Sequence, residues 1–484
     1  MKKLYLSIVF LLLTGQVFPQ GVPDALRLTE PGLGVSARAL GMGNSFVGLS
    51  DDASAMYFNP AGLGLIKKLE ISGGLDYYRF SNNATFFRNE TDYSNSSTQL
   101  NQMSFVFPFP TMRGSLVFGL SYNNIKNFTG ALKFDGFNPG NNSMIQTLED
   151  TDYDFEHYSI PFGLWLSDDN GKVNTIKGKL NQSGEVIQSG SINNWVLSLA
   201  TEVYPNLFIG GSLSIISGEY NYSRDYYEDD YQGIYSNVET AHDHPESKSF
   251  QTFYMNSMIN WELSGWDLKV GLLYQLKKLG RFGLSIQFPK DYTIKEKFDI
   301  DAYSVFGTSL GRVDLPSDIR NNNSDKVEYD IVTPFVLSGG GSINFKGLIA
   351  SAEVSLIDYT QSEFKNPKGI AAQSIANMNK SIKNSLRATA NFNLGLEYTI
   401  PTVGLRLRTG YILQPSPYKD DPSDFNKNYI TGGAGFLIDE TISVDIGYAH
   451  GWWKDYGDNY GYNVSRTLQK VSVDKILLSF SHRF

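Results

Sequence analysis

The stretch GMGNSFVGLSDDASAMYFNPAGLGLI, from Gly41 to Ile66, is rich in glycine and lacks the alternation of apolar and polar residues that marks a strand. It precedes residues 67–484, which show that alternation in many short segments. A compact non-strand segment in front of a barrel has an obvious place inside it. We therefore expect residues 21–66 to form a plug within a β-barrel of residues 67–484, and a plugged barrel implies a selective passage rather than an open pore.

The chain starts with the pattern of a secretion signal, predicted over residues 1–20. Lys2 and Lys3 form its basic start, residues 4–14 its apolar middle, and residues 15–20 its cleavage region. The chain has no cysteine, which excludes disulfides and thiolate metal sites. The formal charge is −9, or −11 once Lys2 and Lys3 are removed, and this acidity argues against nucleic acid as a partner.

The composition favours a membrane barrel. No later stretch offers the ~20 consecutive apolar residues that a transmembrane helix needs. Yet 14% of the residues are aromatic and 46 are glycine. An exported, strand-rich chain of this kind fits an outer-membrane barrel, since closure pairs every backbone group without water. The alternative is a secreted β-sandwich or an array of propeller blades.

Several segments alternate with a period of two residues. In residues 391–398, one face holds Phe392, Leu394, Leu396 and Tyr398, and the other holds Asn391, Asn393, Gly395 and Glu397. The same repeat occurs in 114–122, 281–288 and 441–448. One face suits lipid and the other a polar lumen. Aromatic residues end many of the apolar faces, which favours a membrane barrel with an interfacial girdle over a soluble sandwich.

The alternation predicts an all-β, transmembrane, antiparallel barrel. Fifteen strands are predicted, at 67–80, 99–109, 113–126, 152–168, 192–204, 207–222, 251–276, 281–299, 327–345, 347–359, 386–400, 404–414, 428–438, 441–453 and 471–484. A bacterial single-chain barrel should have an even number, so one assignment is wrong or residues 182–190 add a strand. Long outer loops are predicted near 81–98, 127–151, 223–250, 300–326, 360–385, 415–427 and 454–470, with short turns between them.

The chain ends in KILLSFSHRF, with alternate residues from Ile476 to the terminal Phe484 on one face. This ending resembles the recognition signal of the outer-membrane assembly machinery. We therefore expect that machinery to be a partner through Phe484.

Residues 41–66 resemble the N-terminal motif of the outer-membrane long-chain fatty acid transporter family, which includes aromatic hydrocarbon channels. The matching elements are Gly41 and Gly43, the sequence DDASA from Asp51 to Ala55, and the sequence NPAGL from Asn59 to Leu63. Their spacing also fits. The remaining chain is similar in total length, in loop alternation and in short runs such as LGLEY and VGLLYQL.

The resemblance implies a 14-stranded barrel in the outer membrane, a transporter rather than an enzyme, with no cofactor or metal. It implies that hydrophobic ligands, foremost fatty acids, bind an outer groove between loops and then a pocket in the barrel. A rearrangement of the plug would then open a path to a gap in the wall, from which the ligand leaves sideways into the membrane. Members usually act as monomers. The alternatives are uptake of aromatic hydrocarbons or other apolar compounds, and a surface structural or adhesive barrel.

The resemblance assigns a transport role to residues of the plug. These are Gly41, Gly43, Asp51, Asp52, Asn59, Pro60, Ala61 and Gly62. The same residues can be explained by folding alone: Ser50, Asp51 or Asp52 can cap a short helix starting near Ala53. Asn59 and Pro60 fit a cap followed by the first position of a helix. The glycines would allow tight bends in a narrow lumen.

Two further sets of residues are candidates for ligand contact. Ile375, Met378 and Ile382 have helical spacing with Leu386, and predict an amphipathic helix that is a wall of the outer groove or packs on a neighbouring loop. Arg406 and Arg408 face the lumen if Leu405 and Leu407 face lipid. Either arginine could bind a carboxylate ligand, or form an ion pair with Glu397 or Asp445. Lys269 and Arg281 could likewise bind a carboxylate ligand or form an ion pair in the lumen.

The remaining motifs are weaker. Acidic runs at 149–154, 227–230 and 420–424 could bind cations that bridge lipopolysaccharide, or could be solvated loop tips. His157 and Ser159 lie two apart, as in a hydrolytic site, but the expected Asn-Gly after the serine is replaced by Ile-Pro. Two polar side chains on an ordinary strand are the alternative, and we expect no catalytic residue.

Overall fold

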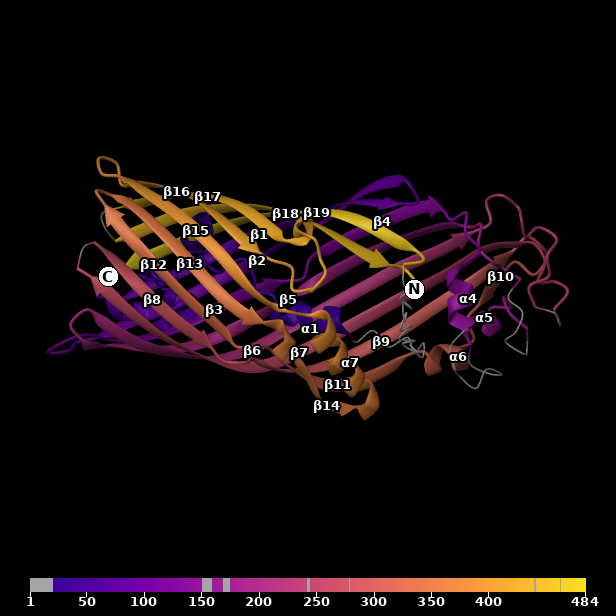
Figure 1. Ribbon diagram of the computed structural model, residues 1–484, viewed down its shortest axis with the longest axis horizontal. Helices are drawn as coiled ribbons and strands as arrows, with labels where there is room; N and C mark the ends of the chain where they lie inside the picture. The colour runs from indigo at the N-terminus through magenta and orange to yellow at the C-terminus, as the bar shows by residue number, and fades with distance from the viewer. Residues whose placement is uncertain are drawn as a thin grey trace, which may run out of the picture.

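The computed structural model describes residues 21–149, 159–168, 175–241, 244–277, 279–438, 441–461 and 463–484. The predicted secretion signal lies outside the described residues. The strands form one antiparallel sheet that closes on itself where β1 (Glu70–Phe86) pairs with β19 (Arg466–Arg483) (Figure 1). Closure joins the first strand to the last, as a membrane barrel requires. The chain is therefore an all-β barrel, as predicted.

The other strands are β2 (Asn89–Phe109), β3 (Leu116–Asn127), β4 (Gly130–Phe137), β5 (Asn181–Tyr204), β6 (Leu207–Asp229), β7 (Phe250–Leu276), β8 (Gly280–Gln287), β9 (Asp291–Phe306), β10 (Arg312–Asp314), β11 (Asp325–Val332), β12 (Val336–Phe345), β13 (Leu348–Asp358), β14 (Glu363–Lys368), β15 (Ala388–Ile400), β16 (Leu405–Gln414), β17 (Lys427–Ile438) and β18 (Ile442–Asp458). The helices outside the plug are α4 (Met144–Glu149), α5 (Ile160–Gly163), α6 (Ser317–Asn322), η2 (Tyr359–Gln361), α7 (Ala372–Ser385) and η3 (Ser423–Phe425). Among the described residues, no helix is long and apolar enough to cross a membrane.

In the described part of the chain the wall has fourteen strands, because four of them are interrupted and each of these carries two strand labels. The interrupted strands are β3 with β4, β8 with β9, β11 with β12, and β13 with β14; β10 is a short extension that pairs with β9. The predicted strand at 152–168 is wrong where it is described, since residues 160–163 form α5, and residues 150–158 lie outside the described residues. Residues 182–190 instead continue the predicted strand 192–204 as β5.

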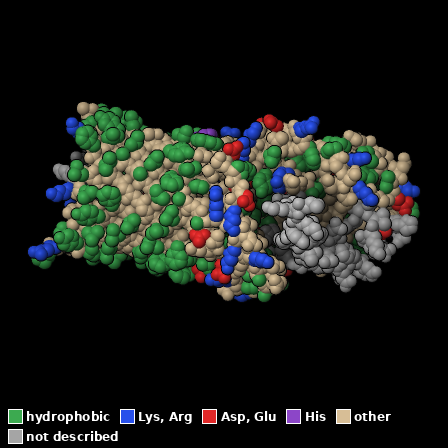
Figure 2. Space-filling view, in the orientation of Figure 1, with side chains coloured by type: hydrophobic (Ala, Val, Ile, Leu, Met, Phe, Trp, Pro, Cys, Tyr) green, Lys and Arg blue, Asp and Glu red, His purple; other side chains and the backbone are tan. Residues whose placement is uncertain are grey.

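The barrel is much taller than a membrane. Strand β7 has 27 residues, whereas ~9–11 tilted residues suffice to cross the hydrocarbon core. Figure 2 shows hydrophobic side chains covering the half of the barrel with the C-terminal end and the short turns, followed by a zone of charged side chains. The other half projects outward, beyond the apolar belt.

The tall outer half explains why several predicted loops are wrong. Residues 81–98 are almost entirely strand, since β1 and β2 meet at a two-residue turn, Phe87–Arg88, with φ of 44° and 74°. Residues 223–229 and 454–458 likewise continue β6 and β18. The outward faces of these strand ends are in water, so they carry no apolar repeat that could reveal them.

Residues 21–66 lie inside the barrel and are called the plug below (Figure 1). The plug contains α1 (Val22–Thr29), α2 (Ala37–Gly41), α3 (Ala55–Phe58) and η1 (Pro60–Leu65). Its apolar side chains share cores with the wall; Met56 and Leu63, for example, pack with Val106 and Val196. A separate core under α4, α5 and α6 fills the outer end and includes Ile160 and Ile319.

Wall glycines bring the barrel backbone close to the plug. They are Gly119, Gly210, Gly271, Gly283, Gly340, Gly395, Gly410, Gly433 and Gly447, each of which would direct a Cβ at plug atoms. A Cβ on Gly283 would lie 2.0 Å from the Val47 oxygen, and one on Gly271 would lie 2.0 Å from the Asn59 side-chain oxygen. The plug is thus fitted to a wall that has no side chains at these positions.

Candidate functional site

Asn59 joins three parts of the structure through one fully buried amide. It caps η1, its Oδ1 accepting the N–H of Ala61 at 3.2 Å, as the Asn-Pro sequence predicts. Its Nδ2 donates to the Val47 oxygen at 2.9 Å, within the plug, and to the Leu272 oxygen of β7 at 3.1 Å. The residue therefore fixes a turn of the plug to the wall.

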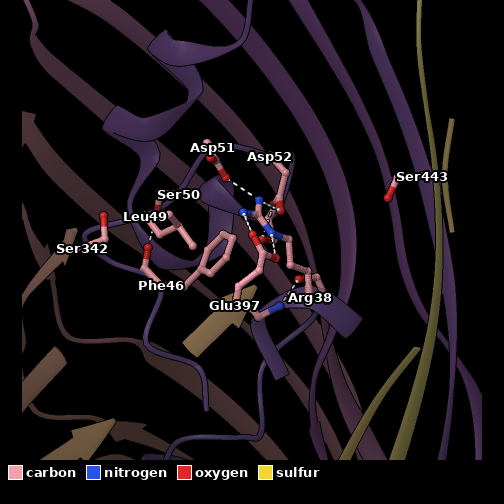
Figure 3. A network of polar contacts seen from close by, with 12 residues as sticks. Arg38, Phe46, Leu49, Ser50, Asp51, Asp52, Ser342, Glu397 and Ser443 are labelled. Atoms are coloured by element: carbon pink, nitrogen blue, oxygen red, sulfur yellow. Dashed lines mark hydrogen bonds and ion pairs between the residues drawn. The ribbon is translucent and has the colours of Figure 1, made fainter. Parts of the chain in front are cut away.

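Asp51 lies in a network of ion pairs between the plug and the wall (Figure 3). Arg38 of α2 contacts Asp51 at 2.5 Å, Asp52 at 3.5 Å and Glu397 of β15 at 2.9 Å, and Arg281 of β8 contacts Asp51 at 2.8 Å. Burial alone would raise the pKa of the Asp51 carboxyl, but the charges of Arg38 and Arg281 outweigh it and hold that pKa well below its usual value. The plug is thus bound to two wall strands by charges.

The predicted lumenal arginines differ in their partners. Arg408 is buried and contacts both Glu397 and Asp445 at 2.6 Å, so it makes both ion pairs that its sequence position suggested. Arg406 lines a small cavity between plug and wall, beside Arg38 and Asp445. The Arg408 guanidinium is therefore occupied by ion pairs with carboxylates of the barrel wall.

The other plug residues contribute to its shape and its attachment. The Gly41 oxygen and the Gly43 N–H bond to the Thr431 hydroxyl at 3.2 and 3.1 Å, and Gly43 has a φ of 60°. A Cβ on Gly62 would lie 2.0 Å from the Ser50 oxygen. Asp52 accepts the N–H of Ser54 at 2.9 Å, one residue before α3, while Pro60 and Ala61 open η1.

Glu353 of β13 contacts the plug, and the sequence did not predict this contact. Its carboxylate accepts the N–H groups of Phe46 and Val47 at 2.9 and 2.8 Å. The sequence shows only a lumen-facing position in an alternating strand, because the partner groups are backbone atoms about 300 residues away, a separation that no local pattern encodes.

A cavity of about 130 Å³ lies between the plug and the wall. Its apolar lining includes Leu28, Phe58, Ile125, Ile192, Val336, Ile357 and Ile412. Three lysines also line it: Lys126 donates to the Glu30 oxygen at 2.8 Å and Lys269 to the Tyr57 oxygen. The third, Lys290, lies between β8 and β9, and its ammonium group has no hydrogen bond or ion pair within the described part of the chain.

The predicted amphipathic helix is α7. Ile375 and Ile382 are buried and Met378 is partly buried, and all three pack in the core that contains α1. The structure does not show whether His157 and Ser159 lie together as in a hydrolytic site, since His157 lies outside the described residues. Ser159 caps α5, its hydroxyl accepting the N–H of Phe162 at 3.2 Å.

Residues 174–475, more than half of the chain, match the family model described as outer membrane protein transport protein (OMPP1/FadL/TodX). The chain belongs to this family. Its members are outer-membrane transport proteins for hydrophobic compounds, not enzymes, and the protein is accordingly an outer-membrane transporter of hydrophobic compounds.

Solved structures of family members share the fold at low sequence identity. The toluene transporter TodX of Pseudomonas putida is 14% identical, with 94% of this chain and 99% of that chain covered and a TM-score of 0.53. A FadL homologue of Pseudomonas aeruginosa is 12% identical, with 94% and 99% covered and a TM-score of 0.54. No curated protein matches the chain.

Proposed function

We propose that this transporter carries apolar molecules with an acidic head group, with long-chain fatty acids the leading class. The observation that carries the proposal is the cavity lining, which combines apolar side chains with Lys290, whose ammonium group has no hydrogen bond or ion pair among the described residues. An acyl chain gains roughly 0.8 kcal/mol for each methylene that leaves water. A carboxylate would supply the partner that a partly buried ammonium group otherwise lacks.

The proposed route runs from the outer loops to the cavity and then sideways through the wall. Ligand pockets usually measure roughly 300–1,000 Å³, so the cavity of about 130 Å³ is too small for a long acyl chain. A rearrangement of the plug is the source of the missing space in this proposal. The apolar ligand moves from water into the membrane, which is favourable, so in this proposal the transfer needs no ATP.

Aromatic hydrocarbons are the second candidate class, because TodX is described as a toluene transporter. An uncharged hydrocarbon would leave Lys290 without a partner, and this favours acids for the present chain. We further propose that the exposed terminal Phe484 is recognised by the assembly machinery, that lipopolysaccharide surrounds the outer half, and that the protein acts as a monomer.

The test is uptake of labelled oleate by cells that lack their own fatty acid transporter. We expect the protein to restore uptake, and Lys290→Gln to raise the oleate concentration at half-maximal uptake by about tenfold, the loss expected for one charge-assisted hydrogen bond. Lys295→Gln is the matched control, because Lys295 is exposed on the nearby strand β9. Oleyl alcohol uptake should be the same in both variants.

Absence of oleate uptake by a correctly assembled barrel would remove fatty acids from the proposal. Toluene uptake that is unaffected by Lys290→Gln would then favour the hydrocarbon class.

A further inference from the structure

The small cavity beside Arg406 is separate from the larger cavity that Lys290 lines. It measures about 50 Å³, and the two cavities have no lining residue in common in the described part of the chain. Thr441, in the short turn between β17 and β18, lines it, and so does Arg483, near the end of the chain. The Arg483 side chain is 36% exposed, so the cavity borders solvent at this end of the barrel. In outer-membrane barrels the short turns face the periplasm.

Most residues that line the small cavity are polar. Three neighbouring strands contribute serines at the same level, since Ser481 of β19 is paired in register with Ser443 of β18 and with Ser72 of β1. Ser36 of the plug faces them across the cavity lining. Its hydroxyl accepts the Ala39 N–H at 3.1 Å, which leaves the hydroxyl hydrogen able to donate to an occupant. The size and the polarity of this cavity both exclude an acyl chain.

Each of the three carboxylates that line the small cavity already has an arginine as its partner. The pairs are Asp52 with Arg38 at 3.5 Å, Glu70 with Arg483 at 2.8 Å, and Asp445 with Arg408 at 2.6 Å. Arg406 of β16 lines the same cavity, but its guanidinium group has no hydrogen bond or ion pair within the residues that the structure describes. The pairing of the charges thus leaves Arg406 without a carboxylate of its own.

Two further groups at the small cavity lack a partner. Gln102 of β2 is 3% exposed, and its Nε2 is buried without a hydrogen bond to any described residue. The Ser481 hydroxyl also has no hydrogen bond to the described parts of the chain. Buried polar groups without partners are destabilising, so an occupant that accepts hydrogen bonds is expected here. An oxyanion has several acceptor oxygens and can accept from Arg406, Gln102 and Ser481 at once.

We propose that the small cavity is a binding site for a small oxyanion from the periplasmic side, held by Arg406, Gln102 and Ser481 of the wall and by Ser36 of the plug. The planar guanidinium group can make two parallel hydrogen bonds to such an anion. Because the anion contacts both the wall and the plug, its binding stabilises the seated plug. The site is separate from the cavity proposed for fatty acids, so the proposal does not depend on which compound is transported.

The first test measures binding of inorganic phosphate to the full-length barrel by calorimetry in a neutral detergent, with chloride keeping the ionic strength constant. We expect one phosphate to bind, and Arg406→Gln to raise its dissociation constant by at least about tenfold, because a charge-assisted hydrogen bond is lost. Ser481→Ala removes one uncharged donor and should raise the dissociation constant by about threefold. It keeps the test decisive if Arg406→Gln fails to assemble.

Arg113→Gln is the matched control for the first test. Arg113 is exposed in the turn between β2 and β3, at the end of the barrel with the short turns, and it does not line the small cavity. We expect this variant to bind phosphate as the parent does. Absence of phosphate binding by the parent would show that water alone fills the cavity and would overturn the proposal. Equal binding by the parent, Arg406→Gln and Ser481→Ala would overturn it as well.

The second test asks whether the anion holds the plug in place. A ligand that binds only the seated plug lowers the population of the displaced plug by a factor of 1 + [L]/Kd. At a phosphate concentration ten times the dissociation constant, we therefore expect cleavage within residues 21–66 by a protease to be about tenfold slower in the parent. Arg406→Gln should show less than about a twofold change at the same concentration. Equal cleavage of the parent in phosphate and in chloride would overturn the link between the anion and the plug.

Discussion

Asn59 illustrates how one side chain can set the position of a whole segment. Its amide reaches η1, a turn of the plug and the wall strand β7, and no water-exposed surface remains on it. Asn59→Ala would leave the Val47 and Leu272 oxygens and the Ala61 N–H without their partner. We expect a loss of about 2–3 kcal/mol in the seating of the plug, measured as faster proteolysis within residues 21–66 while the barrel keeps its resistance to unfolding on heating in detergent.

A second variant tests the same contact without altering Asn59. Gly271→Ala would place a Cβ 2.0 Å from Asn59 Oδ1 and should expose the plug to protease in the same way. Gly211→Ala is its control, because the nearest atom to a Cβ there is 3.8 Å away. A plug equally protected in Gly271→Ala and Gly211→Ala would contradict the assigned role.

The sequence predicts residues of this kind unevenly. The cap at Asn59 and Pro60 is local, so the order of the two residues is enough to find it. Glu353 binds backbone groups far away in the chain, and Lys290 lines a cavity formed by distant residues, yet each looks in the sequence like an ordinary lumenal or strand-end position. The charged residues Arg406 and Arg408 were found by alternation, but alternation cannot choose between a ligand and a buried partner.

At the scale of elements, the plug is held by charges on one side and by backbone contacts on the other. The ion pairs of Asp51 with Arg38 and Arg281 persist at neutral pH, because they hold the pKa of that carboxyl below its unfolded value. A lowered pKa adds stability above the unfolded pKa of about 3.9, and that stability is lost as pH falls through the folded pKa. We expect constant hydrogen-exchange protection of residues 37–58 from pH 8 to pH 5, and a loss of protection below about pH 4.

Asp51→Asn should remove that acid dependence and lower protection at neutral pH. The expected cost is about 2 kcal/mol, less than for a fully buried pair, because the Asp51 side chain keeps 23% exposure. Asp424→Asn breaks the exposed pair with Lys454 and should have little effect. A plug that loses its protection equally in both variants would contradict the anchoring role.

Elements were predictable from the sequence where an apolar face meets lipid. The strands of the apolar belt and α7 have a clear periodicity, and both were predicted. The breaks within strands were not predicted, because a break such as that at Pro334 leaves the alternation of apolar residues in the sequence unchanged. The short helix α5 was mistaken for a strand, since four residues are too few to show a helical period.

At the scale of the whole molecule, the outward faces divide the barrel into two zones. On β6, Leu213 belongs to the apolar belt, whereas Glu219 lies farther out on the same face and is also exposed. We expect Leu213→Arg to lower the free energy of folding into bilayers by about 2–4 kcal/mol, and Glu219→Arg to change it by less than about 0.5 kcal/mol. Denaturant titrations in lipid vesicles measure both. Similar costs for the two variants would place the membrane elsewhere on the barrel.

The contacts of Arg483 have a consequence for the order of assembly. This residue, the second to last in the chain, contacts Glu70 at the start of β1 at 2.8 Å, and the Asp51 oxygen of the plug at 3.4 Å. Glu70 also accepts the Ala53 N–H of the plug at 3.2 Å. One carboxylate therefore joins the first strand, the last strand and the plug. This contact cannot form until synthesis has ended and β19 has paired with β1. A chain that lacks its last two residues would therefore lose the contact that joins barrel closure to the seating of the plug.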